Sequence, residues 1–101
     1  MTALTGIRTV EPNVLRLDGD DNVAIVLRGL MAGERLASRN EDFGVVAASE
    51  IQPGHKVALE PIPKGGSVRR YGAPVGLATV DIAPGEHVHV HNVRSVRLPE
   101  P

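Results

Sequence analysis

The sequence predicts a small all-β domain, built from short strands that Pro/Gly turns connect. The first observation is a pattern that occurs four times: an apolar residue, two variable positions, a glycine, two variable positions and another apolar residue. We call this pattern the corner motif, and its copies span residues 30–36, 51–57, 62–68 and 82–88. The second is a proline shortly before the glycine in three of the copies. Proline presets one dihedral angle of a turn, and glycine accepts the positive φ that the next position often needs. The third is the composition, because aromatic residues make up only 2% and valine, which favours strands, is the main aliphatic residue.

The first strands are expected to follow one another closely. Residues 7–17 can form a strand, and Pro12 confines part of it to an edge or a bend. The polar stretch 17–22 predicts a turn, because Asp and Asn side chains bond to their own backbone. The apolar run 23–27 favours a strand over a single helical turn, since it is short and rich in β-branched residues.

The middle of the chain is less regular. Residues 37–44 have the least periodic pattern and are expected to form a mobile loop, and residues 45–48 a short strand. The second and third copies of the corner motif start eleven residues apart, which suggests a hairpin-like pair. Residues 71–76 are rich in turn formers, and residues 96–98 can extend a last strand before the tail.

Charge and composition exclude several classes of function. The formal net charge is −1, and the clustered Lys/Arg and stacking aromatic residues of a nucleic-acid binder are missing, so neither nucleic acid nor an anionic membrane is an expected partner. The chain has no cysteine, which excludes disulfides, thiolate zinc sites and cysteine nucleophiles. No apolar stretch approaches the ~20 residues of a membrane span, and the N-terminus lacks the layout of a signal peptide. A cytoplasmic location is therefore expected.

Histidines are the main candidates for chemistry. All four lie in the second half of the chain: His55, His87, His89 and His91. If residues 87–91 form a strand, the last three histidines line one face while Val88 and Val90 point into the core. Three imidazoles on one face could hold a divalent metal or act as general acids and bases. The alternative is an exposed polar face of an edge strand.

Two further groups could contact a ligand. His55 and Lys56 follow a predicted Pro-Gly turn, where a cation among backbone N–H groups could bind a carboxylate, although a solvated turn is an equal alternative. Tyr71 could donate a hydrogen bond to a ligand, but a packing role is favoured. The basic pair Arg69-Arg70 is interpreted as two solvated side chains near a turn.

Taken together, several segments resemble a known family. They are Asp21-Asn22-Val23-Ala24, Gly54-His55-Lys56-Val57-Ala58-Leu59, Tyr71-Gly72, Val75-Gly76 and Asp81-Ile82-Ala83-Pro84-Gly85-Glu86-His87-Val88-His89-Val90-His91-Asn92. In this order they resemble the N-terminal SAF domain of the altronate and galactarate dehydratase family, most closely its altronate branch. The resemblance implies a β-clip-like SAF domain over 14–94, an N-terminal extension or edge strand over 1–13, and a tail over 95–101.

The resemblance also implies a function. Members of the family are hydro-lyases that remove water from sugar acids, commonly with divalent iron, and a larger catalytic domain or subunit accompanies the SAF domain. The small subunit of sulfolactate sulfo-lyase is similar. This chain is therefore expected to be a lyase component that is inactive alone and meets a large dehydratase partner and a small hydroxy acid.

The same resemblance assigns roles to residues of this chain. His89 and His91 are the catalytic candidates and could also ligate the metal. His55, Lys56 and Asn92 are expected to bind substrate. The alternatives are a sulfolactate sulfo-lyase-like small subunit, a non-catalytic module that binds sugar acids, and a structural adaptor.

Overall fold

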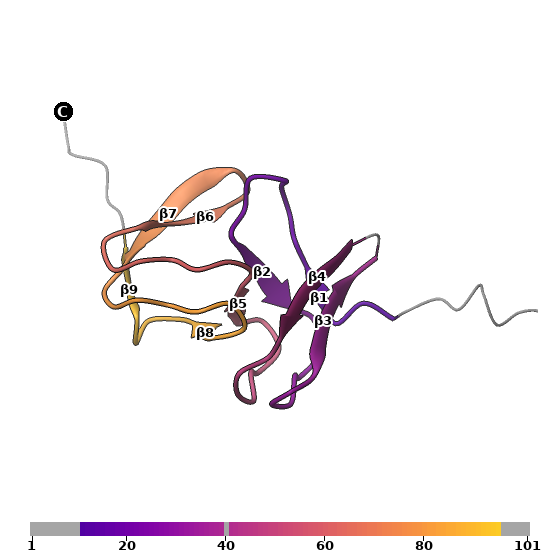
Figure 1. The fold of residues 1–101 in the computed structure, drawn as a ribbon. Helices are drawn as coiled ribbons and strands as arrows, with labels where there is room; N and C mark the ends of the chain where they lie inside the picture. The colour runs from indigo at the N-terminus through magenta and orange to yellow at the C-terminus, as the bar shows by residue number, and fades with distance from the viewer. Residues whose placement is uncertain (1–10, 40, 96–101) are drawn as a thin grey trace, which may run out of the picture.

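The computed structural model describes residues 11–39 and 41–95, which form an all-β domain without a helix (Figure 1). Within these ranges nine strands make three antiparallel sheets. In chain order the strands are β1 (Val14–Leu15), β2 (Val23–Val26), β3 (Arg35–Ser38), β4 (Glu41–Val46), β5 (Lys56–Ala58), β6 (Ser67–Arg70), β7 (Ala73–Ala78), β8 (His87–Val88) and β9 (Val93–Ser95). The predicted all-β class is confirmed. No helix that could cross a membrane occurs in the described ranges.

The largest sheet has the strand order β1-β2-β5-β8, and the others are the hairpin β3-β4 and the sheet β6-β7-β9. In Figure 1, β2 and β5 lie in the middle, with the β3-β4 hairpin on one side and β6, β7 and β9 on the other. The register places Ala24 opposite Val57, and Val57 opposite His87. Segments far apart in the sequence therefore meet around β5.

The corner motif forms the same structure in all four copies. Its glycines have φ angles of 86°, 88°, 83° and 89°, the positive φ that the third position of a type II turn requires. The glycine N–H donates to the carbonyl of a buried residue on another segment, and the N–H of that residue donates back to the carbonyl of the residue after the glycine. These eight hydrogen bonds are 2.7 to 3.0 Å long. In motif order the clamped residues are Ala47, Val26, Ala78 and Ala58.

The apolar positions of the motif form the core. All eight are at most 2% exposed, and fully burying each such aliphatic side chain contributes roughly 1.5–3 kcal/mol. The first and second copies belong to one apolar cluster, and the third and fourth to another. Isolated bridges join Leu30 to Ile51 and Ile62 to Ile82. The predicted pairing of the second copy with the third is therefore wrong, because the copies pair in the order first with second and third with fourth.

Buried polar side chains connect the sheets. Asn22 donates to the carbonyl of Ser67 at 2.9 Å and accepts from the backbone N–H of Arg69 at 2.8 Å, which attaches β6 to the end of β2. The buried carboxylate of Asp21 accepts from the N–H groups of Tyr71 and the following glycine, at 3.0 and 2.7 Å. These bonds hold Tyr71 at a φ of 59°. Because buried polar groups need partners, these contacts fix the start of β7.

The predicted loop over residues 37–44 instead belongs to a β-hairpin, as far as the described residues 37–39 and 41–44 are concerned. Strands β3 and β4 pair antiparallel, with Ala37 opposite Asp42 and a register shift between Arg35 and Ala37. An ion pair of 2.9 Å joins Arg35 to Asp42, and the guanidinium of Arg16 lies 5.7 Å from the centre of the Phe43 ring. Leu36 of this hairpin is fully buried, and Phe43 and Val45 of β4 pack against the same apolar cluster, so one face of the hairpin joins the core while the exposed ion pair adds little.

The predicted strand over residues 88–91 is also wrong in its extent. Strand β8 ends at Val88, the chain turns over residues 89–92, and Val90 is 81% exposed instead of pointing into the core. In the apolar run 23–27, residues 23–26 form β2, which confirms the predicted strand. The strand predicted over residues 45–48 is wrong in its bounds, because it is the end of β4, which stops at Val46.

Three expectations extend beyond the described part of the chain. Of the predicted first strand, β1 accounts for Val14 and Leu15, while residues 7–10 lie outside the described residues, as do 96–98 and most of the predicted tail.

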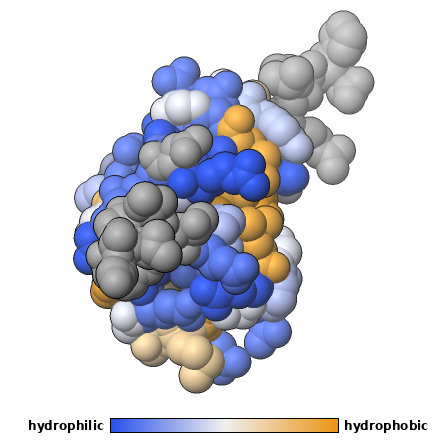
Figure 2. Space-filling view, turned by 90° about the vertical axis from the view of Figure 1, so that its right-hand side faces the viewer, coloured by the Kyte–Doolittle hydropathy of each residue, from blue (hydrophilic) through white to orange (hydrophobic). Residues whose placement is uncertain are grey.

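Figure 2 views the molecule from the side of β3 and β4 in Figure 1. This face is mostly hydrophilic, with an apolar strip near its right edge.

Candidate functional site

Three histidines from two corners of the fold meet at one place. His55 follows the second corner turn, and His87 begins β8 after the fourth, where the pairing of β5 with β8 brings the two together. Their Nδ1 and Nε2 atoms are 2.7 Å apart, so one ring donates a hydrogen bond to the other. His89 completes the group, because one nitrogen from each ring lies within 4.8 Å of the others. We call these three residues the histidine cluster.

The rings of the histidine cluster are stacked. The centroids of His55 and His89 are 4.0 Å apart with an interplanar angle of 14°, and those of His55 and His87 are 4.9 Å apart. His91 is more exposed and tilted, with its centroid 5.0 Å from that of His87. His91 is therefore a neighbour of the cluster rather than one of its members.

A buried asparagine shapes the turn that carries His89. The side chain of Asn92 accepts from the N–H of His89 at 2.9 Å and donates to the carbonyl of His87 at 2.8 Å. The backbone N–H of Asn92 donates to the carbonyl of His89 at 3.1 Å. These bonds bend the chain after β8, so that His89 turns toward His55 while Val90 faces outward.

The environment favours neutral imidazoles. Partial burial, together with the neighbouring histidines and Lys56, lowers the pKa of His87. Partial burial and the charges of His55, Lys56 and His91 lower the pKa of His89. A neutral imidazole keeps a lone pair on one ring nitrogen, which is the form that binds a metal or accepts a proton.

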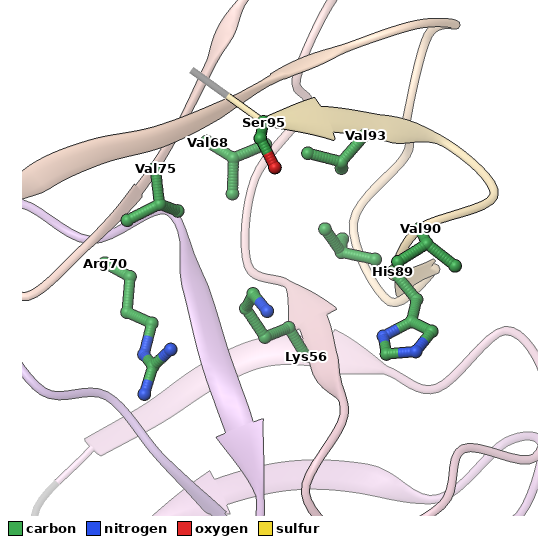
Figure 3. Close-up of a pocket in the computed structure, with 9 residues that line it drawn as sticks. Lys56, Val68, Arg70, Val75, His89, Val90, Val93 and Ser95 are labelled. Carbon is green, nitrogen blue, oxygen red and sulfur yellow. The ribbon is translucent and has the colours of Figure 1, made fainter. Parts of the chain in front are cut away.

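A pocket of about 200 Å³ adjoins the histidine cluster, and His89 belongs to both (Figure 3). Lys56 and Arg70 bring two cationic side chains to it, so we call it the cationic pocket. Burial and the charge of Arg70 lower the pKa of Lys56. Its complete lining is Lys56, Val68, Arg70, Val75, Val88, His89, Val90, Val93 and Ser95.

A second hollow, of about 470 Å³, also borders the histidine cluster. His87 and His91 line it together with the carboxylates of Asp81 and Glu86. We call it the acidic hollow. The two hollows that the cluster borders thus differ in the sign of the charges that line them.

Most of the predicted site residues come together. His55 and His89 are in the histidine cluster, Lys56 lines the cationic pocket, and His91 lies at the edge of the cluster. Asn92 is close to them, but backbone partners engage both polar atoms of its side chain.

Two features of the site were not predicted: the contact of His87 with His55, and the place of Arg70 in the pocket. His87 had been placed on the same face as His89, and its contact with His55 depends on the pairing of β5 with β8, which sequence spacing does not reveal. Arg70 had been interpreted as solvated. The alternation of side chains along a strand gives the signal that separates it from Arg69, which bonds to the carbonyl of Asp20 at 2.8 Å.

Fold and site together define a small all-β domain that presents clustered imidazoles beside an open cationic pocket. Comparison with known proteins then gives the family. The family model described as the altronate/galactarate dehydratase SAF domain matches residues 12–96, and this chain belongs to that family.

Known relatives have two sizes. The altronate dehydratase of Bacillus subtilis is 40% identical over 81 residues, which are 80% of this chain and 16% of that protein. The galactarate dehydratase (L-threo-forming) of Escherichia coli is 37% identical over 73% of this chain and 14% of its own length. The (2R)-sulfolactate sulfo-lyase subunit alpha of Chromohalobacter salexigens is 37% identical over 79% of this chain and 90% of that subunit. The chain therefore spans about a sixth of the dehydratases that it matches, and most of the small subunit.

Proposed function

We propose that this chain is the SAF component of a sugar-acid hydro-lyase and works with a larger catalytic domain or subunit. The observation that carries the proposal is the histidine cluster beside an open pocket, in a domain of a family named for dehydratases. The cationic pocket, at about 200 Å³, is smaller than the roughly 300–1,000 Å³ of a typical ligand site. A second surface would therefore complete the site.

The reaction requires a base and an acid. Dehydration of a 2,3-dihydroxy acid breaks the C–H bond next to the carboxylate and the C–O bond at the following carbon, and the departing hydroxide takes up a proton. Imidazoles suit both transfers, because their pKa lies near neutrality. His91 is the candidate for moving a proton, since it is exposed beside the cluster and its ring has no hydrogen bond to another described residue. His89, which faces the cationic pocket, is the second catalytic candidate.

The histidine cluster also suits a divalent metal such as iron. Three imidazole nitrogens within 4.8 Å of one another are a donor set that Zn²⁺, Fe²⁺ and Co²⁺ accept. His55, His87 and His89 would hold the ion, and His91 could join them after a change of side-chain conformation. When bound, the metal would supply Lewis acidity toward a substrate oxygen.

A sulfo-lyase-like small subunit is the second candidate function. The alignment with the sulfo-lyase subunit alpha covers 90% of that protein, so a separate polypeptide of this size has a precedent among the relatives. In that case the group that leaves is sulfite rather than water. The same imidazoles and cationic pocket would serve either elimination.

Reconstitution tests the proposal. The altronate dehydratase of Bacillus subtilis, deleted for the region that this chain matches, is mixed with this chain and assayed for dehydration of altronate. We expect no turnover by either part alone and turnover by the mixture. Turnover of sulfolactate by a mixture with a sulfo-lyase large subunit, but none of altronate, would select the second candidate. Binding of altronate by the chain without turnover in any mixture would indicate a non-catalytic binding module.

A further inference from the structure

We propose that Lys56 and Arg70 together form the carboxylate-binding end of the site, with the rest of the acid directed toward His89. The assignment to a substrate rests on the proposed function, whereas the anion site itself rests on the pocket. Arg70 is the new member of the site, because the sequence predicted a solvated side chain at this position, next to Arg69 and near a turn.

Neither cation has a partner of opposite charge among the described residues. In residues 11–39 and 41–95, the arginines at positions 16, 28, 35 and 69 form ion pairs with carboxylates. Lys56 and Arg70 form none in the same ranges. The Nε atom of Arg70 is moreover buried and donates to no acceptor among the described residues. A buried donor without a partner costs roughly 1–3 kcal/mol, and an anion in the pocket would remove that cost.

Two side chains of like charge share the cationic pocket, whose walls are largely apolar. Lys56 and Arg70 line the same pocket as the fully buried Val68 (Figure 3). The fully buried Val88 also belongs to its lining. Two cations repel each other, and an apolar wall strengthens that repulsion because it lowers the local dielectric constant. An anion between them reverses the sign of both interactions. Arginine in particular matches a planar carboxylate with two parallel hydrogen bonds.

The position of His89 favours one orientation of a bound acid. His89 lines the cationic pocket and is also a member of the histidine cluster. A carboxylate bound by Lys56 and Arg70 therefore places the adjoining carbons on the side of His89, where the C–H and C–O bonds of a hydroxy acid react. The acidic hollow, which His87 also lines, carries Asp81 and Glu86 and would repel a carboxylate. The charges thus favour one orientation over its reverse.

The pocket is open at its rim. Val90 is 81% exposed and Val75 is 38% exposed, and both belong to the lining. The volume of about 200 Å³ accommodates a carboxylate and the first carbons of an acid rather than a whole sugar acid. The remainder of the ligand would extend past this rim toward the larger partner.

A titration of the isolated chain with lactate tests the anion site without any turnover. Lactate carries the 2-hydroxy carboxylate group, and lactamide is its neutral counterpart of similar shape. In ¹⁵N-labelled protein, we expect lactate but not lactamide to shift the amide resonances of residues that line the cationic pocket. Arg70→Gln and Lys56→Gln should each weaken lactate binding by about tenfold or more. Arg94→Gln is the matched control, because Arg94 is exposed on β9 and lies outside the pocket lining.

Kinetics of the reconstituted enzyme separate this inference from the proposed function. If Arg70→Gln raises the KM for altronate and leaves association of the two parts unchanged, the assignment to the substrate carboxylate is supported. If it weakens association and leaves KM unchanged, Arg70 pairs with an acidic group of the partner and the inference fails while the enzyme function stands. Lactate shifts that Arg70→Gln does not affect, or no shifts at all, would also overturn the inference. If the shifts occur as expected but no mixture turns over altronate, the anion site stands and the proposed function fails.

Discussion

Replacement of Gly85 by alanine is expected to destabilise the domain far more than the same change at Gly65. Both glycines occupy the third position of a corner turn, with φ angles of 89° and 83°. An L-residue with such a φ costs roughly 1–2 kcal/mol at either position. The surroundings differ, since a Cβ on Gly85 would lie 2.0 Å from the carbonyl oxygen of Val46, whereas a Cβ on Gly65 would meet nothing within 4 Å.

The clash at Gly85 involves backbone that hydrogen bonds fix on both sides. The N–H of Gly85 donates to the carbonyl of Ala58 at 2.8 Å, and its carbonyl accepts from the N–H of Ala48 at 2.9 Å. Admission of a methyl group would stretch these bonds, which contribute about 0.5–1.5 kcal/mol each, and would add roughly 1–3 kcal/mol of overpacking. With the backbone strain included, Gly85→Ala should cost about 3–6 kcal/mol and Gly65→Ala about 1–2 kcal/mol.

Urea unfolding followed by far-ultraviolet circular dichroism measures both free energies. A domain of this size is typically stable by about 5–15 kcal/mol, so Gly65→Ala should remain folded while Gly85→Ala is marginal or unfolded. Equal free energies of unfolding for the two variants would refute the reasoning. They would mean that the fourth corner does not press against the end of β4.

Three further predictions concern the site and its support. His87→Asn should weaken Co²⁺ binding to the tag-free chain by more than about tenfold, as read from the visible absorption of the ion, and an unchanged affinity would exclude the histidine cluster as the metal site. Asn92→Ala should lower the free energy of unfolding by roughly 2–3 kcal/mol in urea, because it leaves the carbonyl of His87 and the N–H of His89 without partners; a loss below that of an exposed Asn→Ala change would contradict this role. The N–H of Met31, with Asn13 and Arg28, holds the pKa of Glu34 below its ordinary value. The carboxylate therefore stabilises the fold at pH values above its ordinary pKa of 4.5, and this contribution is lost as the pH falls through the lower pKa of the folded state. In acid unfolding curves, Glu34→Gln should thus differ most from the wild type near neutrality, and a constant difference down to pH ~2 would contradict the assignment.

The corner motif was predictable because its requirements are local. A glycine with positive φ, a nearby proline and two apolar residues at fixed distances suffice to specify a turn between two buried strand ends. The order in which the copies pair was not predictable. It depends on which buried residue each turn clamps, as Gly54 clamps Val26 from a distant segment.

The site was predictable in part for the same reason. The close spacing of three histidines was enough to identify them as candidates. Their geometry, however, depends on Asn92, which ends β8 early and turns Val90 outward. The contact between His55 and His87 joins residues 32 positions apart. The β3-β4 hairpin was missed because its apolar positions are few: Leu36, Phe43 and Val45 pack on the core, but charged and polar residues separate Leu36 from the other two in the sequence.

We propose above all that imidazoles of this chain complete a catalytic site in a larger partner. The most direct measurement is the rate of altronate dehydration by the reconstituted enzyme, with wild-type chain, His87→Asn and His91→Ala, alongside the affinity between the two parts. We predict that His87→Asn lowers kcat by about a hundredfold or more, that His91→Ala lowers it too, and that neither changes association. Undiminished turnover with either variant, in an enzyme that still requires this chain, would contradict the role of that histidine; undiminished turnover with both would contradict the account.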